Sequence, residues 1–475
     1  MTLDERLTQV TPSPRQLAHQ QLEFYAFVHF TVNAFTDREW GDGTEDPAIF
    51  NPEKLDAEQW AKAILSAGMK GLILTCKHHD GFCLWPSKLT KHSVASSPFR
   101  GGHGDIVREV SDACRKYGLK FGVYLSPWDR NCPLYGQGEA YDDYFVGQLT
   151  ELLTGYGDIF SVWFDGACGE GPNGKKQIYD WARYYAVIRE LQPGACISVC
   201  GPDVRWCGNE AGHTRKAEWS VVPARMRTTE KIAEKSQQSD DASFRLRKIS
   251  SSDEDLGSRE ILKDEPDLVW FAAEVNTSIR PGWFWHASEN DRVRSLEDLM
   301  HVYWGSVGGN ATFLLNIPPT NEGLFHENDV RRLGEIGAEL EKTFRTNLLP
   351  GAVLTADSEA EGCGIGGVRE DGYERYYRAA DGRNTASIEI RWPSPVRAGT
   401  VVMKEIILMS QRVESFAVDA LIDGEFREVY GGTVIGYKRI VPLGCVETSA
   451  IRVRILDSRT EPTLAFLGIY EAKED

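Results

Sequence analysis

Several features that mark common classes of protein are missing from this sequence of 475 residues. No stretch approaches the roughly 18 apolar residues of a membrane-spanning helix, so no membrane association is predicted. The ten cysteines include no C-x-x-C pair, which is the spacing typical of structural zinc sites and redox motifs. We therefore predict neither a metal ion nor a cofactor.

The sequence also has no excess of positive charge. The chain has 53 Lys and Arg against 70 Asp and Glu, a formal net charge of -17. Nucleic-acid binding depends on clustered cations, so a nucleic-acid partner is not expected. A neutral ligand such as a sugar fits better, and the 13 Trp and 17 Tyr suit the apolar faces of sugar rings. Nothing in the sequence indicates the oligomeric state.

The first 16 residues contain early acidic positions and no apolar run of seven or more, unlike a secretory signal. A cytoplasmic location is the resulting expectation. A secretory leader that had been trimmed away would leave the same picture.

Short, almost continuous apolar runs alternate with amphipathic segments through the first 320 residues. Runs of this kind are typical of parallel strands buried on both faces, and the segments between them have helical periodicity. The expected strands are residues 24–30, 70–76, 119–126, 158–164, 195–200, 217–223, 268–275 and 311–317. Eight strand and helix units favour a (β/α)₈ barrel over an open sheet, and the polar segment 231–267 reads as a loop or insertion.

The pattern changes after residue 345. Polar and apolar residues then alternate with a period of two, in segments joined by turn residues, as in an antiparallel β-sandwich. We therefore predict a barrel domain over residues 1–345 and a C-terminal β-sandwich over residues 346–475.

Reactive side chains cluster where the expected strands end. Chemistry in (β/α)₈ barrels takes place at the carboxyl ends of the strands. The residues at those ends are His29, then His78, His79 and Asp80, then Tyr124 and Trp128, then Trp163 and Asp165, and finally Asn209 and Glu210. Their occurrence at five successive strand ends predicts a catalytic site.

The stretch after Asp165 has the spacing of a phosphate-binding loop, with Gly169, Gly174 and Lys175 in the G-x-x-x-x-G-K pattern. Its next position is Lys176, where such loops need a Ser or Thr to hold Mg²⁺. The Asp165 carboxylate would also stand beside the phosphates. We interpret this stretch as a glycine-rich surface loop rather than a nucleotide site.

Several of these motifs together resemble the family 29 α-L-fucosidases. The matching stretches are VHF (28–30), EW (39–40), CKHHDGFCLWPS (76–87), YLSPWD (124–129), WFDGACGEGPNGKKQ (163–177) and WCGNEAG (206–212). They follow the family's order through nearly the whole barrel, and a barrel followed by a β-sandwich is similar to that family's architecture. The CGNEAG stretch resembles the branch that acts on α-1,3 and α-1,4 linked fucose.

The resemblance implies a retaining exo-hydrolase with Asp165 as the nucleophile. The residues that it implies around the fucose are His29, Glu39, Trp40, His78, His79, Tyr124 and Trp163. Retaining glycosidases need two carboxyl groups about 5 Å apart, one to attack the anomeric carbon and one to protonate the leaving oxygen. Asp165 supplies the first of them, and imidazole and hydroxyl donors are expected to keep it ionised.

The acid/base residue is expected to be Glu210, with Glu218 and Glu274 as rivals. Glu218 would lie within the expected sixth strand and Glu274 near the end of the seventh, so the sequence does not exclude either.

Further positions are expected to recognise the rest of the substrate. Trp163 and Trp285 can face the C6 methyl of fucose, while His78 and His79 suit neighbouring hydroxyls. Trp283 and His286 are expected to contact a second sugar, and Glu170 and Asn173 to bind its hydroxyls.

The sequence thus predicts an exo-α-L-fucosidase that removes α-1,3/1,4-linked fucose from Lewis-type oligosaccharides and glycoconjugates through a covalent intermediate. Broad linkage specificity is the main alternative. A metal-dependent barrel hydrolase using His29, His78, His79 and Asp165, a barrel hydrolase for another sugar, and a sugar-binding protein without activity also stay open.

Overall fold

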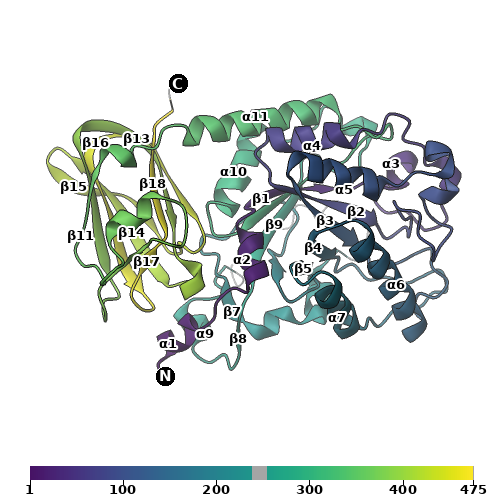
Figure 1. The fold of residues 1–475 in the computed structure, drawn as a ribbon, viewed down its shortest axis with the longest axis horizontal. Helices are drawn as coiled ribbons and strands as arrows, with labels where there is room; N and C mark the ends of the chain where they lie inside the picture. Colours follow the sequence, from purple (N-terminus) through teal and green to yellow (C-terminus); the bar gives the residue numbers. More distant parts are fainter. Residues whose placement is uncertain (238–253, 474–475) are drawn as a thin grey trace.

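Eight parallel strands close into a barrel in the first three quarters of the chain (Figure 1). This computed structural model describes residues 1–237 and 254–473. Around the barrel the order is β1-β10-β9-β6-β5-β4-β3-β2. The strands are β1 (Phe24–Val28), β2 (Gly71–Lys77), β3 (Lys120–Leu125), β4 (Ile159–Phe164), β5 (Cys196–Val199), β6 (Val204–Trp206), β9 (Ala272–Ser278) and β10 (Thr312–Asn316). The predicted (β/α)₈ barrel is confirmed.

The barrel is surrounded by helices that begin and end where capping residues predict. Asp56 and Asp105 accept hydrogen bonds from the first free backbone amides of α4 and α5, and α5 ends at Gly118 in the left-handed conformation. The helices around the barrel are α4 (Ala57–Ser66), α5 (Ile106–Tyr117), α6 (Glu139–Gly155), α7 (Trp181–Leu191), α10 (Leu296–Ser306) and α11 (Glu327–Phe344). The shorter helices are α1 (Leu3–Thr8), α2 (Pro14–Gln20), α3 (Asn33–Thr36), α8 (Thr229–Lys235) and α9 (Arg259–Leu262).

The sixth barrel strand is β6, and the prediction of residues 217–223 for this strand is wrong. Those residues instead contribute β7 (Val221–Pro223), which pairs antiparallel with β8 (Leu268–Trp270) in a separate two-stranded sheet. The three residues of β6 complete the barrel between β5 and β9. Asn209 and Glu210 therefore follow the sixth strand rather than the fifth.

Alternation along β1 decides which of its side chains enter the barrel. Tyr25 and Phe27 belong to the small apolar cluster inside the barrel, whereas Phe24, Ala26 and Val28 pack in the larger core outside it. Successive strand residues point to opposite faces, so His29 continues the inner row at the carboxyl end of the strand.

The C-terminal domain is an antiparallel sheet of order β11-β13-β16-β14-β15, with β18 also paired to β13. Its long central strands, β13 (Ala386–Lys404) and β16 (Arg439–Ser458), have irregular register, which interrupts the ladder and allows the sheet to bend into a sandwich. The other strands are β11 (Val353–Ala356), β12 (Tyr377–Arg378), β14 (Val413–Ile422), β15 (Glu425–Gly432), β17 (Thr463–Leu464) and β18 (Phe466–Glu471). The predicted division after residue 345 falls between α11 and β11.

The two domains are joined by a buried charge cluster. Glu23, next to β1, accepts hydrogen bonds from Lys438 (2.8 Å) and Lys404 (3.4 Å) of the C-terminal domain. Burial opposes ionisation of Glu23, but these lysines prevail and lower its pKa to about 2.

The predicted polar insertion 231–267 begins inside α8 and contains α9, and its residues 238–253 lie outside the described part. Among the described helices, none is both long and apolar enough to cross a bilayer.

Candidate active site

A cavity at the carboxyl ends of the barrel strands holds about 420 Å³ of open space. It brings together most of the residues that the strand ends predicted. Its lining is Phe27, His29, Glu39, Trp40, His78, His79, Trp163, Asp165, Ala167, Glu210, Gln237, Asn276 and Trp283.

Asp165 follows β4 and has a side chain that is 24% exposed, so its carboxylate is accessible from the cavity. Tyr124 donates a hydrogen bond to Oδ2 (3.0 Å), and the Ala167 amide donates one to Oδ1 (2.9 Å). These two hydrogen bonds fix the orientation of the carboxylate. Tyr124 does not line the cavity and contributes to the site by holding the Asp165 carboxylate.

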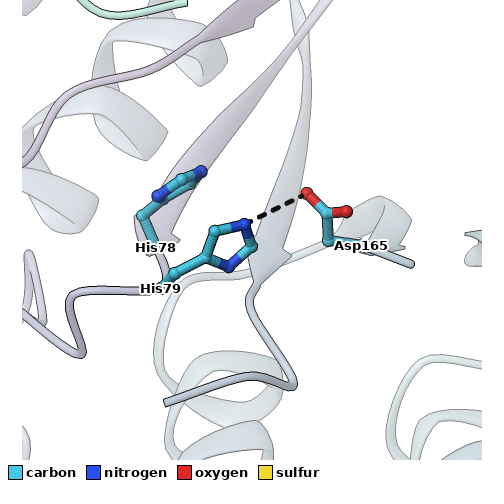
Figure 2. Close-up of side chains that lie close together, drawn as sticks. All are labelled: His78, His79 and Asp165. Carbon is cyan, nitrogen blue, oxygen red and sulfur yellow. Dashed lines mark ion pairs between the residues drawn. The ribbon is translucent and has the colours of Figure 1, made fainter. Parts of the chain in front are cut away.

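His79 faces Asp165 through a defined ring nitrogen (Figure 2). Its Nδ1 lies 2.7 Å from Ser126 Oγ, and the Ser126 hydroxyl donates to the carbonyl of Trp128. Nδ1 must therefore carry the proton, which leaves Nε2 as an acceptor 3.8 Å from Asp165 Oδ2. Burial lowers the pKa of His79 to about 4, although Asp165 opposes the change, so the ring is neutral near pH 7.

His29 is fixed in the same way. Asn316 donates its amide hydrogens to Ser278 Oγ and to the carbonyl of Trp283, so its Oδ1 accepts from His29 Nδ1 at 2.8 Å. The remaining nitrogen, Nε2, is an acceptor. Burial lowers the pKa of His29 to about 4.

His78 lies against both histidines and stacks on Tyr124, with ring centroids 5.6 Å apart. Burial, followed by the neighbouring imidazoles, lowers its pKa well below the ordinary value. Its Nδ1 is buried with no hydrogen-bond partner among the described residues. Three neutral imidazoles therefore border the cavity, and neutral imidazole nitrogens suit the hydroxyl groups of a sugar.

Glu210 enters the cavity from the loop after β6. Trp283 donates its indole N–H to Glu210 Oε2 (2.8 Å), and Thr277 of β9 donates to the Glu210 carbonyl (2.7 Å). Side chain and backbone of Glu210 are thus both tied to β9 and the loop that follows it.

Glu39 holds the loop after β9 from the other side. Its carboxylate accepts hydrogen bonds from the amides of Trp283 (2.8 Å) and Phe284 (3.1 Å). His286 bridges Glu39 and Asp37, at 2.7 Å from each. The hydrogen bond with Glu39, ahead of that with Asp37, raises the pKa of His286 to about 9 despite burial, so this histidine is cationic near pH 7.

The rival acids lie outside the cavity lining. Glu218 is 2% exposed and pairs with Arg205 and Arg215. Burial opposes its ionisation, but the two arginines keep its pKa below the ordinary value, which does not suit a proton donor.

Glu274 is fully buried behind Trp163, whose indole N–H donates to its Oε1 (2.8 Å). Tyr25 donates to its other oxygen. Burial raises the pKa of Glu274 to about 7.

Four of the predicted contacts to a second sugar or to the methyl group also lie outside the lining. Trp285 donates its indole N–H to Asn290 Oδ1 (3.0 Å), and both ring nitrogens of His286 are engaged within the protein. Glu170 and Asn173 are exposed on the loop after β4. Ala167 of that loop and Trp283 of the loop after β9 line the same cavity.

Sequence reasoning missed four residues of the lining: Phe27, Ala167, Gln237 and Asn276. Phe27 was accessible from its spacing, because it stands two residues before His29 on the same strand and so faces the same side. Asn276 stands in the same relation to Glu274 on β9. For Ala167 and Gln237, no local pattern gives the position.

Three of these side chains also form a possible set of metal ligands. Within the described residues, His78, His79 and Asp165 each offer one ligand atom, and these atoms lie within 4.8 Å of one another (Figure 2). Neutral imidazole and carboxylate are donors that transition metals accept.

The sequence and the fold are both similar to those of known glycosidases. The sequence model described as Alpha-L-fucosidase matches residues 14–343. The chain belongs to the α-L-fucosidase family. It is 38% identical to Alpha-L-fucosidase 1 of Arabidopsis thaliana over 97% of this chain and 88% of the relative.

Solved structures of fucosidases agree over the whole chain. A candidate α-L-fucosidase from Bacteroides ovatus shares 44% identity with a TM-score of 0.85, covering 100% of this chain and 77% of that one. A family 29 fucosidase from Ruminococcus gnavus, solved with fucose, shares 30% identity with a TM-score of 0.84 over 98% and 95% of the two chains. The present chain is therefore a fucosidase-family glycoside hydrolase with barrel and sandwich in the family's order.

Proposed function

We propose that the protein is a retaining exo-α-L-fucosidase that releases α-1,3/1,4-linked fucose from Lewis-type oligosaccharides and glycoconjugates. The observation that carries this proposal is the pairing of Asp165 and Glu210 in one cavity lined by neutral histidines. The family supports fucose as the sugar, and a relative from Ruminococcus gnavus was solved in complex with fucose.

In the first step, an oxygen of Asp165 attacks the anomeric carbon of fucose as the bond to the leaving oxygen breaks. Tyr124 and the Ala167 amide hold the carboxylate in place for this attack. Glu210 gives its proton to the leaving oxygen, which departs as a hydroxyl of the remaining glycan. The fucose is then an ester of Asp165.

In the second step, Glu210 is ionised and takes a proton from a water molecule, whose oxygen attacks the same anomeric carbon. The ester bond to Asp165 breaks, and two inversions give net retention. Trp283 holds one oxygen of Glu210 through both steps.

The histidines are proposed to recognise the hydroxyls of fucose. The Nε2 atoms of His29 and His79 are acceptors, so each accepts a hydrogen bond from a sugar hydroxyl. A hydroxyl near His79 Nε2 and Asp165 Oδ2 can donate its single hydrogen to one of these two acceptors. Trp163 and Phe27 are the apolar residues of the lining that suit the C6 methyl.

The test of this mechanism is mass spectrometry of the protein after incubation with a 2-deoxy-2-fluoro-fucosyl inhibitor. We expect one added 2-fluoro-fucosyl group on the peptide that contains Asp165, and no label on the folded Asp165→Asn variant. A label on another carboxylate, or none while the enzyme is being inactivated, would overturn the assignment.

The histidine and aspartate cluster favours one other function, a metal-dependent hydrolase. Dialysis against EDTA distinguishes the two, because the proposed mechanism needs no metal. Full activity after dialysis is expected. Loss of activity that returns with added Zn²⁺ would instead support the metal-dependent reaction.

A further inference from the structure

The loop that carries Glu210 is fastened at several points. We call residues 207–218 the Glu210 segment. Near its start, the Asn209 side chain accepts from the amides of Ala211 (3.1 Å) and His213 (3.0 Å) and donates to the His213 carbonyl (3.0 Å). Arg215 donates to the Cys207 carbonyl (3.0 Å), which closes the segment into a loop. The position of Glu210 therefore depends on both ends of the segment.

The far end of the segment is anchored by Glu218. Its side chain is held by Arg205 and Arg215, as described above. Its backbone carbonyl accepts a hydrogen bond from Asn310 Nδ2 at 2.7 Å. Asn310 is 2% exposed and lies between α10 and β10, far from the segment in sequence.

Asn310 at the same time contacts the C-terminal domain. Its side-chain oxygen Oδ1 accepts a hydrogen bond from the backbone amide of Tyr437 (2.7 Å). The backbone N–H of Asn310 donates a hydrogen bond to the Lys438 carbonyl (3.0 Å). The next residue, Arg439, donates a hydrogen bond to the carbonyl of Lys216 in the Glu210 segment (3.1 Å).

The contact between Asn310 and the C-terminal domain is tightly packed. Gly436 has φ of +61°, and a Cβ there would lie 2.2 Å from Asn310 Oδ1. The chain at residues 436–439 thus packs directly on the Asn310 amide, and a shift of the C-terminal domain would be transmitted to the Glu210 segment.

We propose that the C-terminal domain positions the catalytic acid/base, and that Asn310 is the positioning residue that links residues 437–438 to Glu218. This inference rests on the proposed role of Glu210. Proton transfer to the leaving oxygen requires hydrogen-bond distance, and small misplacements have large effects on rate. Loss of the Asn310 bridge should therefore weaken acid catalysis while leaving the attack by Asp165 intact.

The test is the Asn310→Gly variant of the full-length protein. Asn310 has φ of +73°, which glycine adopts without strain, so this change removes the side-chain bridge and keeps the backbone. The readout is kcat/KM on two aryl fucosides, one with a poor leaving group and one with an activated leaving group, each normalised to the active enzyme titrated with the 2-fluoro inhibitor. We expect a loss of about tenfold on the poor leaving group and less than about twofold on the activated one.

Two further variants separate positioning from stability. Asn310→Asp keeps the acceptor for Tyr437 but loses the donor to Glu218, so it should show the same selective loss if Asn310→Gly fails to fold. The control is Asn347→Gly in the C-terminal domain, because Asn347 Oδ1 also accepts from backbone amides, those of Leu349 (3.0 Å) and Ile469 (3.3 Å), and contacts β18 rather than the Glu210 segment. This control should lose no selectivity between the two substrates.

Glu210→Ala, measured in parallel, tells failure of this inference from failure of the proposed function. If Glu210→Ala is selective for the activated substrate and the Asn310 variants lose activity equally on both substrates, or not at all, the inference is wrong. If Glu210→Ala itself is unselective, Glu210 is not the acid/base and the proposed function must be revised.

Discussion

At the scale of single residues, Asp165 and Glu210 differ in what their substitution should do. A poor leaving group needs a proton as it departs, whereas an activated one does not. We predict that Glu210→Ala lowers the rate about 10² to 10⁴-fold on a natural linkage or a poor aryl leaving group, and far less on an activated aryl fucoside. Steady-state kinetics on the two substrates measures the difference.

Azide provides the matching control. If a fucosyl-enzyme accumulates in the Glu210→Ala variant, azide should take it to β-fucosyl azide, in which the anomeric configuration is inverted relative to the substrate. Equal losses on both substrate types with no azide product would point to another acid.

Glu274 is a buried carboxyl group whose effect on the free energy of unfolding depends on pH. Its pKa rises from 4.5 to about 7 on folding, so the native state binds more protons than the unfolded state between these values. The free energy of unfolding therefore falls as the pH rises through this window. Glu274→Gln, which stays neutral, should gain stability relative to the wild type, on the order of 3 kcal/mol above pH 7 and little below pH 4.5.

Urea denaturation at pH 5 and pH 8 checks this prediction. The wild type should lose stability relative to Glu274→Gln as the pH rises. A Gln variant that is destabilised equally at both pH values would contradict this prediction. It would show that the hydrogen bonds from Tyr25 and Trp163 to the carboxylate stabilise the fold more than burial of the charge destabilises it.

The sequence pointed to Asp165 because this carboxylate stands directly after a buried strand, and to Glu210 through the resemblance of the CGNEAG stretch to the family. It did not separate Glu210 from Glu218 and Glu274. Their difference lies in partners remote in sequence: Glu218 meets two arginines, and Glu274 meets Tyr25 and Trp163. Composition around a glutamate does not reveal such contacts.

At the scale of elements, the barrel strands were predictable where burial on both faces made them continuously apolar. The sixth strand was not. β6 has only three residues, and its Arg205 side chain turns to Glu218 in a buried ion pair. Residues 217–223 look more like a strand and do form one, but its partner is β8, which no local pattern gives.

The loop after β9 is the element that we expect to contact the part of the substrate beyond fucose. Cationic His286 ties it to Asp37 and Glu39, which fixes Trp283 beside Glu210. A rigid rim can use contacts with a neighbouring galactose to position the scissile bond. We predict that kcat/KM is at least about tenfold higher on a Lewis a or Lewis x trisaccharide than on the α-1,3/1,4 fucosyl disaccharide without galactose, a difference of about 1.4 kcal/mol.

Release of fucose from the two glycans, followed by chromatography, measures this ratio, with an α-1,2-linked fucoside as the comparison. Equal rates on the trisaccharide and disaccharide, or a preference for the α-1,2 linkage, would indicate broad or different linkage specificity. They would also show that the loop after β9 does not recognise the neighbouring galactose.

At the scale of the whole molecule, the sequence predicted two domains of the right kinds from the change of period near residue 345. The way they join could not be predicted. Glu23, Asn310 and Gly436 make their contacts across 100 residues or more, and an isolated glutamate, asparagine or glycine gives no sign of such a role.

We expect the Glu23 cluster to couple the unfolding of the two domains. A barrel that parted from the sandwich would lose the ion pairs of Glu23 with Lys404 and Lys438, although Glu23 would keep Lys70 and Lys404 would keep Asp371. We predict a single calorimetric transition whose van't Hoff and calorimetric enthalpies agree. Glu23→Gln leaves Lys438 without this carboxylate partner, whereas Lys404 keeps Asp371, and it should lower the melting temperature or split the transition in two. Two transitions in the wild type would show instead that each domain melts by itself.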